Sequence, residues 1–200
     1  MILPRLLVLT DRRACLRPLP DVVAAAVEGG ARAVVLREKD LPPPDRALLA
    51  ERLHRLLAPV DGLLIVAGGG TEAAAVHLGS AESLPDPRPL LLGRSCHSGS
   101  EVARAAVEGL DWVTVSPVHP TTSKPGYGPA LGHDGLAALC LTPGAPKVYA
   151  LGGVGPGSTT ACLSAGAYGV AVMGAVMRAE DPARCVELLT GELPVDRSVR

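Results

Sequence analysis

VYALGGVGPGSTTACLSAGAYGVAVM, residues 148–173, holds two runs of small and branched apolar residues on either side of a segment with helical periodicity. The runs Val148 to Gly152 and Gly169 to Met173 are almost continuously apolar, as expected of parallel strands that are buried on both faces. The segment between them, Gly157 to Ala165, follows a proline and ends beside a glycine, which is typical of a helix. This stretch therefore predicts one β-α-β unit.

The same unit recurs along the chain. Eight strands are predicted, at Arg5 to Asp11, Ala33 to Lys39, Leu63 to Ala67, Ala75 to Gly79, Leu90 to Ser95, Trp112 to Val118, Val148 to Gly152 and Gly169 to Met173. Six helices are predicted, at Leu19 to Glu28, Pro44 to Leu57, Ser100 to Glu108, Gly135 to Cys140, Gly157 to Ala165 and Pro182 to Leu189.

This order predicts an α/β protein of one domain, a (β/α)₈ TIM barrel over residues 1–190 with a frayed tail at 191–200. Residues 68–74 are too few for a normal crossover helix, so the connection between the third and fourth strands is expected to be shortened. A doubly wound open sheet is the main rival, because one missed strand would change the count.

Composition excludes several classes of protein. The chain is 48% hydrophobic with a formal charge of −1, which excludes intrinsic disorder and gives no general reason to bind nucleic acid or an anionic membrane. Charged residues, proline or glycine interrupt every apolar run, so no membrane span is expected. The five cysteines are scattered without a CxxC pair, which fits a reducing cytoplasm. A homo-oligomer is compatible with these data.

Polar residues gather where the predicted strands end, which is where TIM barrels carry their active sites. Alternation along the second strand sends Arg37 and Lys39 to one side and Glu38 to the other. Two cations facing one way suggest a phosphate or diphosphate clamp. The alternative is a solvated rim in which these cations pair with Glu38 and Asp40.

Four further strand ends carry candidate ligand-binding groups. The fifth strand ends at Ser95, and Cys96 after it is expected to be structural. The loop after the sixth strand predicts a polyanion lid, although an ordinary surface loop is the alternative. Glycines after the seventh and eighth strands suggest a monophosphate site. The residues concerned are Thr121, Ser123 and Lys124 in the loop, and Gly152, Gly153, Met173 and Gly174 in the glycine segments.

These motifs resemble the thiamin phosphate synthase and TenI family of (β/α)₈ proteins. The likeness covers nearly the whole chain, through Leu-Thr-Asp (9–11), Leu-Arg-Glu-Lys (36–39), Val-His-Leu-Gly (76–79), Gly-Arg-Ser-Cys-His (93–97), Pro-Thr-Thr-Ser-Lys (120–124), Leu-Gly-Gly-Val (151–154) and Gly-Ala-Tyr-Gly-Val-Ala-Val-Met (166–173). The resemblance implies a thiamine biosynthesis enzyme that couples hydroxymethylpyrimidine diphosphate to thiazole phosphate and releases diphosphate. Its partners would be small phosphate and diphosphate substrates.

Roles follow from the resemblance by position. Arg37, Lys39, Ser95 and Lys124 would hold the diphosphate, Thr121 and Ser123 would line the lid, and Gly152, Gly153, Met173 and Gly174 would hold the thiazole phosphate. Glu82 falls near one of the family's magnesium carboxylates, so the implied cofactor is Mg²⁺.

The chain also departs from the synthase pattern. Val35 replaces a glutamine that would pair with the pyrimidine, and Ala67-Gly68 replaces an Asn-Asp pair that would supply an amide and a magnesium carboxylate. These losses keep a TenI-like thiazole tautomerase open as an alternative. His119, two residues beyond the matching position Pro117, would then be its acid/base. A non-catalytic phosphate-binding barrel is the third interpretation.

Overall fold

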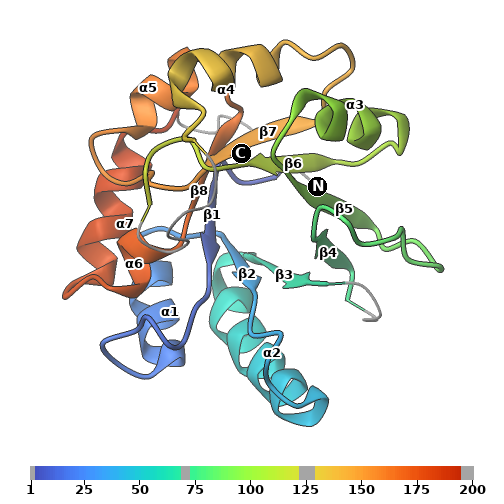
Figure 1. The fold of residues 1–200 in the computed structure, drawn as a ribbon. Coiled ribbons are helices and arrows are strands. Elements are labelled where there is room, and N and C mark those ends of the chain that lie inside the picture. The colour runs from blue at the N-terminus through green and yellow to red at the C-terminus, as the bar shows by residue number, and fades with distance from the viewer. Residues whose placement is uncertain (1–2, 69–72, 122–128, 195–200) are drawn as a thin grey trace.

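A computed structural model describes residues 3–68, 73–121 and 129–194, and these form a closed barrel of eight parallel strands (Figure 1). The strands are β1 (Leu6–Leu9), β2 (Ala33–Leu36), β3 (Leu63–Ala67), β4 (Ala75–Leu78), β5 (Leu91–Cys96), β6 (Trp112–Val115), β7 (Lys147–Leu151) and β8 (Gly169–Val172). Each strand pairs with its neighbours in sequence, and β1 also pairs with β8. The predicted TIM barrel is confirmed, and the open sheet is excluded.

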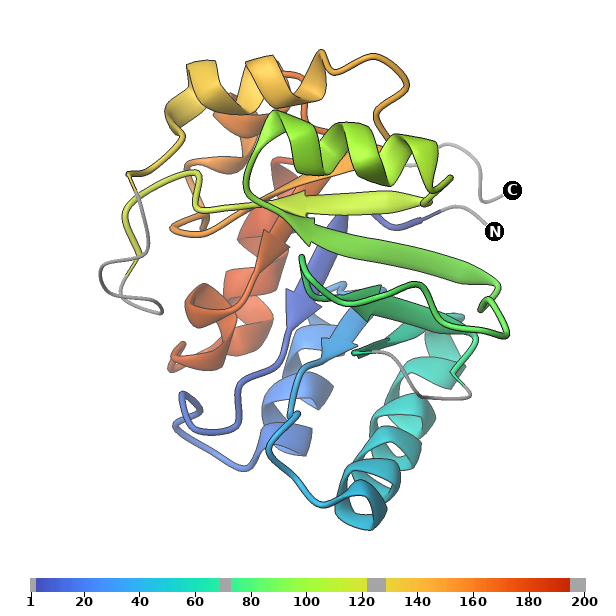
Figure 2. The ribbon, with the colours of Figure 1, turned by 45° about the vertical axis from the view of Figure 1, so that its right-hand side comes forward.

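Helices lie around the outside of the barrel (Figures 1 and 2). They are α1 (Leu19–Glu28), α2 (Pro43–Leu57), α3 (Gly99–Val107), α4 (Gly132–Cys140), α5 (Thr159–Ser164), α6 (Gly174–Met177) and α7 (Pro182–Gly191), with a 3₁₀ turn at Ala58–Val60. The six predicted helices are all present, and the short α6 was not predicted. Among the described residues, no helix is long and apolar enough to cross a membrane.

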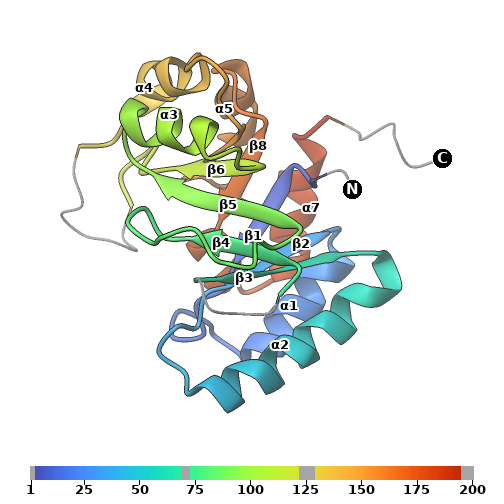
Figure 3. The same cartoon turned by 90° about the vertical axis from the view of Figure 1, so that its right-hand side faces the viewer.

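Two successive connections depart from the β-α repeat. Only residues 68–74 join β3 to β4, as expected from the sequence, and 69–72 lie outside the described residues. Residues 79–90, which join β4 to β5, are all described and contain no helix. Figure 3 shows this loop running over β4 on the side of the barrel between α2 and α3.

Arg94 on β5 takes over part of the role of the missing helix. Its side chain is fully buried on the outward face of the strand, where Nη1 donates to the carbonyl oxygens of Gly79, Ser80 and Glu82 at 3.2, 3.2 and 2.5 Å. Nη2 forms an ion pair with Glu108 at 3.0 Å. One guanidinium thus satisfies three loop carbonyl groups that a helix would otherwise satisfy within itself.

The core has two layers, one inside the barrel and one between the strands and the helices. Alternation along each strand divides them: Leu7, Val35, Ile65 and Tyr149 fill the inside. Aliphatic residues fill the outer layer, which explains how a chain with 2% aromatic residues forms a core of this size. The inner layer closes one end of the barrel, so the other end is free to form a cavity.

Candidate active site

A cavity of about 520 Å³ opens at the carboxyl ends of the strands. Its walls come from all eight strands or the loops after them, and the predicted residues among them are Arg37, Lys39, Ser95, Thr121, Gly152, Gly153, Met173 and Gly174. The structure therefore brings together eight residues that are far apart in sequence. Ser123 and Lys124 lie outside the described residues.

Arg37 and Lys39 both line the cavity, while Glu38 between them does not. Glu38 is buried and binds Arg12, accepting from the main-chain N at 3.1 Å and from Nη1 at 2.9 Å. Asp40 pairs with Arg12 at 2.6 Å, which holds the pKa of its carboxyl at about 2. Among the described carboxylates, none forms an ion pair with Arg37. Glu38 and Asp40 are thus paired with Arg12 and Arg13 and not with the cations of the predicted phosphate clamp. This excludes the alternative of a rim in which Arg37 and Lys39 pair with Glu38 and Asp40.

Lys39 extends across the cavity mouth towards the ends of β3 and β4. Its Nζ forms an ion pair with Glu82 Oε1 at 2.7 Å, and Glu82 Oε2 accepts from the main-chain N of Gly79 at 2.9 Å. A Cβ built on Gly68 would lie 3.4 Å from this ammonium group. The ammonium therefore lies over the β3 and β4 end of the barrel.

Ser95 is held by a buried histidine for which the sequence analysis proposed no role. His77 Nε2 lies 3.1 Å from Ser95 Oγ and 3.3 Å from Thr114 Oγ1, and His77 Nδ1 accepts from Trp112 Nε1 at 3.1 Å. Indole nitrogen can only donate, so His77 Nδ1 carries no proton and Nε2 does. With Nε2 donating to Ser95, the serine hydroxyl keeps its own hydrogen for a ligand in the cavity.

His77 stays uncharged because burial, with the charge of Lys39 adding to it, lowers its pKa to about 3. The network forms because Gly93 lies between His77 and Trp112 in the β4-β5-β6 register. A Cβ at Gly93 would lie 2.0 Å from the Trp112 ring, so only glycine leaves room for the indole to reach the histidine. The glycine opposite the histidine is the sequence signal that could have revealed this contact.

The glycine segments after β7 and β8 form the opposite wall. Gly152 and Gly153 have φ of +91° and +67°, and a Cβ on Gly153 would lie 2.6 Å from His119 Cβ. After β8, Arg178 also lines the cavity, and a Cβ on Gly174 would lie 2.1 Å from its Nη2. Arg178 is a further cation beside the predicted phosphate site, one helical turn beyond Gly174, and the sequence analysis did not identify it.

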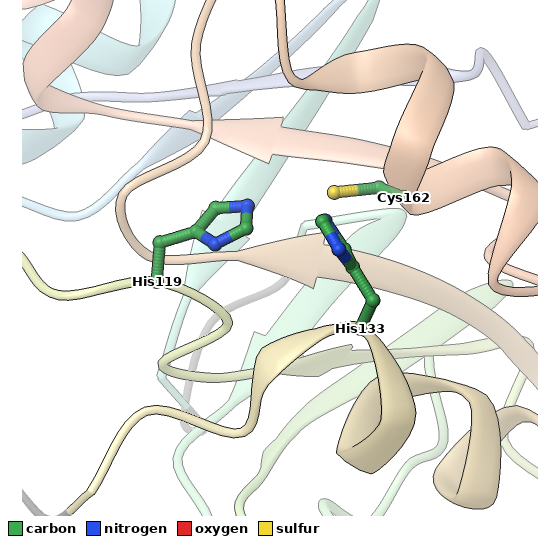
Figure 4. A group of neighbouring side chains, drawn as sticks. All are labelled: His119, His133 and Cys162. Carbon is green, nitrogen blue, oxygen red and sulfur yellow. The ribbon is translucent and has the colours of Figure 1, made fainter.

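His119 does not line the cavity. Its ring packs edge-on against His133, with 5.1 Å between ring centroids (Figure 4). Burial, together with nearby His133, lowers the pKa of His119. Strand β6 ends at Val115, so strand alternation does not extend to His119 and cannot direct its side chain into the cavity.

Cys96 is fully buried in the outer layer, and burial raises its pKa to about 12. A thiol with that pKa carries almost no thiolate at neutral pH and is no nucleophile. Cys96 therefore serves the packing of the barrel, as expected from the sequence.

His97, the next residue, lines the cavity, and its Nδ1 lies 2.8 Å from the carbonyl oxygen of Ser116.

Comparison with known proteins adds independent findings. A family model described as thiamine monophosphate synthase matches residues 6–176. A Geobacter sulfurreducens protein, provisionally named a thiamine-phosphate synthase, is 39% identical over 94% of each chain. The thiamine-phosphate synthase of Albidiferax ferrireducens is 38% identical over 86% of this chain and 83% of its own. A solved thiamine phosphate pyrophosphorylase from Pyrococcus furiosus superposes with a TM-score of 0.81 at 30% identity, covering 94% of each chain.

Proposed function

The chain belongs to the thiamine monophosphate synthase family, and we propose that it joins hydroxymethylpyrimidine diphosphate to thiazole phosphate, forming thiamin phosphate and releasing diphosphate. Two anionic substrates would have to occupy one cavity side by side. A cavity of about 520 Å³ lies within the usual range for small-molecule sites.

The observation that carries this proposal is that cationic side chains lie on opposite walls of the cavity. In the closed strand order, β3 and β4 lie across the barrel from β7 and β8. Lys39 reaches the β3 and β4 side, and Arg178 lies beside Gly174 on the β8 side. Arg37 lies near the second wall, with Nη1 2.6 Å from Met173 Sδ and 3.3 Å from the carbonyl oxygen of Thr10. These opposed positions support the proposal of separate subsites for a diphosphate and a monophosphate.

In the proposed reaction the bond between the pyrimidine methylene carbon and the diphosphate oxygen breaks, and its electron pair leaves with the diphosphate. The thiazole nitrogen then supplies the electron pair of the new carbon–nitrogen bond. Negative charge grows on the departing oxygen, so Lys39 and the Ser95 hydroxyl, directed by His77, would bind the transition state more tightly than the substrate. Each ~1.4 kcal/mol of such selective binding accelerates the step about tenfold.

Thr121 lines the cavity and marks where the proposed lid begins. We retain Ser123 and Lys124 in that lid as predictions from the sequence, because they lie outside the described residues. A lid over the diphosphate would keep water from the reactive pyrimidine carbon.

The two positions at which the family resemblance places magnesium carboxylates, Gly68 and Glu82, offer the ion no unpaired carboxylate. Diphosphate-bound Mg²⁺ takes one or two protein carboxylates. Glu82 is the residue we propose for contact with such an ion, but its carboxylate is already neutralised by Lys39 and bound to the main chain of Gly79. Gly68, which replaces the second carboxylate, has φ of +94° and brings no side chain.

The tautomerase finds no support at His119, because this histidine, proposed as its acid/base, lies outside the cavity.

The direct test is incubation of the full chain with both synthase substrates and Mg²⁺, followed by detection of thiamin phosphate. Carboxythiazole phosphate, the tautomerase substrate, is assayed in parallel. Formation of thiamin phosphate supports the proposal. Isomerisation without coupling would replace it with the tautomerase, and binding of thiazole phosphate without either reaction would leave a binding protein.

A further inference from the structure

Three potential metal ligands meet outside the cavity, between the barrel and its outer helices. His119 lies in the loop after β6, His133 in the first turn of α4, and Cys162 in α5. We call them the His/Cys cluster. Their ligand atoms lie within 4.8 Å of one another, and Figure 4 shows the two rings and the thiol directed into one common space. None of the three residues lines the cavity.

Main-chain hydrogen bonds fix the positions from which these side chains extend. The main-chain N of His119 donates to the carbonyl oxygen of Gly152 at 2.9 Å, and that of Gly132, beside His133, donates to Val118 at 3.0 Å. The main-chain N of Cys162 donates to Ser158 at 3.3 Å. The backbone positions of the three metal-ligating residues therefore stay near one another when no metal ion is bound, which lowers the entropic cost of binding an ion.

His119 also carries an unused donor atom. Its Nε2 is buried and has no hydrogen-bond partner among the described residues. An unsatisfied buried polar atom costs about 1–3 kcal/mol, so some compensating contact is expected. A metal ion in the common space would use this nitrogen.

We propose that the His/Cys cluster binds one Zn²⁺ ion through two imidazole nitrogens and one thiolate, with water as the fourth ligand. This donor set suits zinc and not magnesium, which prefers oxygen. Tetrahedral zinc with bonds of about 2.0–2.3 Å places its ligand atoms about 3.3–3.6 Å apart. The cluster would therefore contract by roughly 1 Å, which side-chain rotation alone can supply. On binding, the Cys162 thiol releases its proton to solvent and nothing is oxidised or reduced.

Zinc at this position would cross-link three successive parts of the barrel. It would tie the loop that carries Pro117 and Thr121, both at the cavity wall, to α4 and α5. Ions that bind only the folded state raise its stability, so the metal-bound protein would unfold at a higher temperature.

The test uses untagged, reduced, metal-free full-length protein titrated with Co²⁺, which reports thiolate ligation through a near-ultraviolet charge-transfer band. We expect one equivalent to bind and Zn²⁺ to displace it. His133 is exposed, so His133→Asn should leave the fold intact while weakening Co²⁺ binding about tenfold or more. Cys162→Ser should abolish the band. Cys185→Ser, which removes a half-buried helical thiol without a histidine cluster, is the matched control and should bind as the parent does.

Three results would overturn the proposal. These are the absence of saturable binding in the parent protein, a charge-transfer band that persists in Cys162→Ser, and unchanged affinity in His133→Asn. If circular dichroism shows that Cys162→Ser is unfolded, His133→Asn decides alone. The readout is metal binding, so its failure is distinct from failure of the synthase assay.

Discussion

Replacing His77 by glutamine should change how stability depends on pH. His77 is buried with a pKa of about 3 in the folded protein, against 6.5 for an ordinary histidine. As the pH falls from about 7 to about 4.5, the unfolded chain gains a proton at this residue and the folded chain does not. The linkage relation then predicts that the folded state loses about 2.5 kcal/mol of stability from His77 alone. Glutamine does not titrate, so the variant should not show this loss.

The assay is urea unfolding at both pH values, followed through the fluorescence of Trp112, the one tryptophan of the chain. At pH 7 we expect His77→Gln to be less stable by about 1–3 kcal/mol, because glutamine pairs imperfectly with Trp112 and Ser95. At about pH 4.5 this gap should close or reverse. His54→Gln, an exchange at an exposed position on α2, controls for the substitution itself. Equal acid losses in parent and His77→Gln would refute the assignment of His77 as a neutral buried group.

Three further substitutions probe the site and the fold. Ser95→Ala should lower kcat for coupling about 10- to 100-fold and leave both KM values within a few fold, because the hydroxyl acts on charge that grows in the transition state; a change in KM alone would contradict this. Gly174→Ala places a methyl group on the Arg178 guanidinium, so KM for thiazole phosphate should rise about tenfold while the unfolding midpoint stays near the parent value. Arg94→Met removes the donor to three loop carbonyl groups and leaves Glu108 with Arg104 as its ion-pair partner, so it should cost about 3–5 kcal/mol in urea unfolding. A loss below about 1 kcal/mol would show that the loop over β4 does not depend on Arg94.

The barrel could be predicted because its strands are short, continuous apolar runs. Parallel order then places all strand ends at one mouth, which is why Arg37, Lys39 and Ser95 could be assigned to one cavity without any contact being known. What alternation gave correctly was the separation of Arg37 and Lys39 from Glu38. Alternation could not place the His119 side chain, because His119 lies beyond the end of β6, where the period of two no longer holds.

Contacts across strands could not be predicted in the same way. His77 lies in an apolar run, and its partners are 18 and 35 residues further along the chain. The space that joins them comes from the absent side chain of Gly93. The His/Cys cluster could not be predicted for a similar reason. Its members come from the loop after β6, from α4 and from α5, and their spacing in the sequence does not match a known metal-ligand motif.

The backbone conformation at Gly68 bears on the replacement of the family's Asn-Asp pair by Ala67-Gly68. Ala67 lines the cavity, whereas Gly68 has φ of +94°, which L side chains rarely adopt. Exchanging Gly68 for aspartate would therefore strain the chain as well as bring a carboxylate towards Lys39. Ala67→Asp places a carboxylate at the cavity wall without that strain.

The central claim is that one cavity holds a diphosphate on the Lys39 side and a monophosphate on the Arg178 side. The most direct measurement is KM for each synthase substrate in Lys39→Met and in Arg178→Met, at fixed salt and saturating second substrate. Lys39→Met should raise KM for the pyrimidine diphosphate about tenfold or more and leave KM for thiazole phosphate within a few fold, and Arg178→Met should do the reverse. Equal increases for both substrates in both variants would contradict two separate subsites.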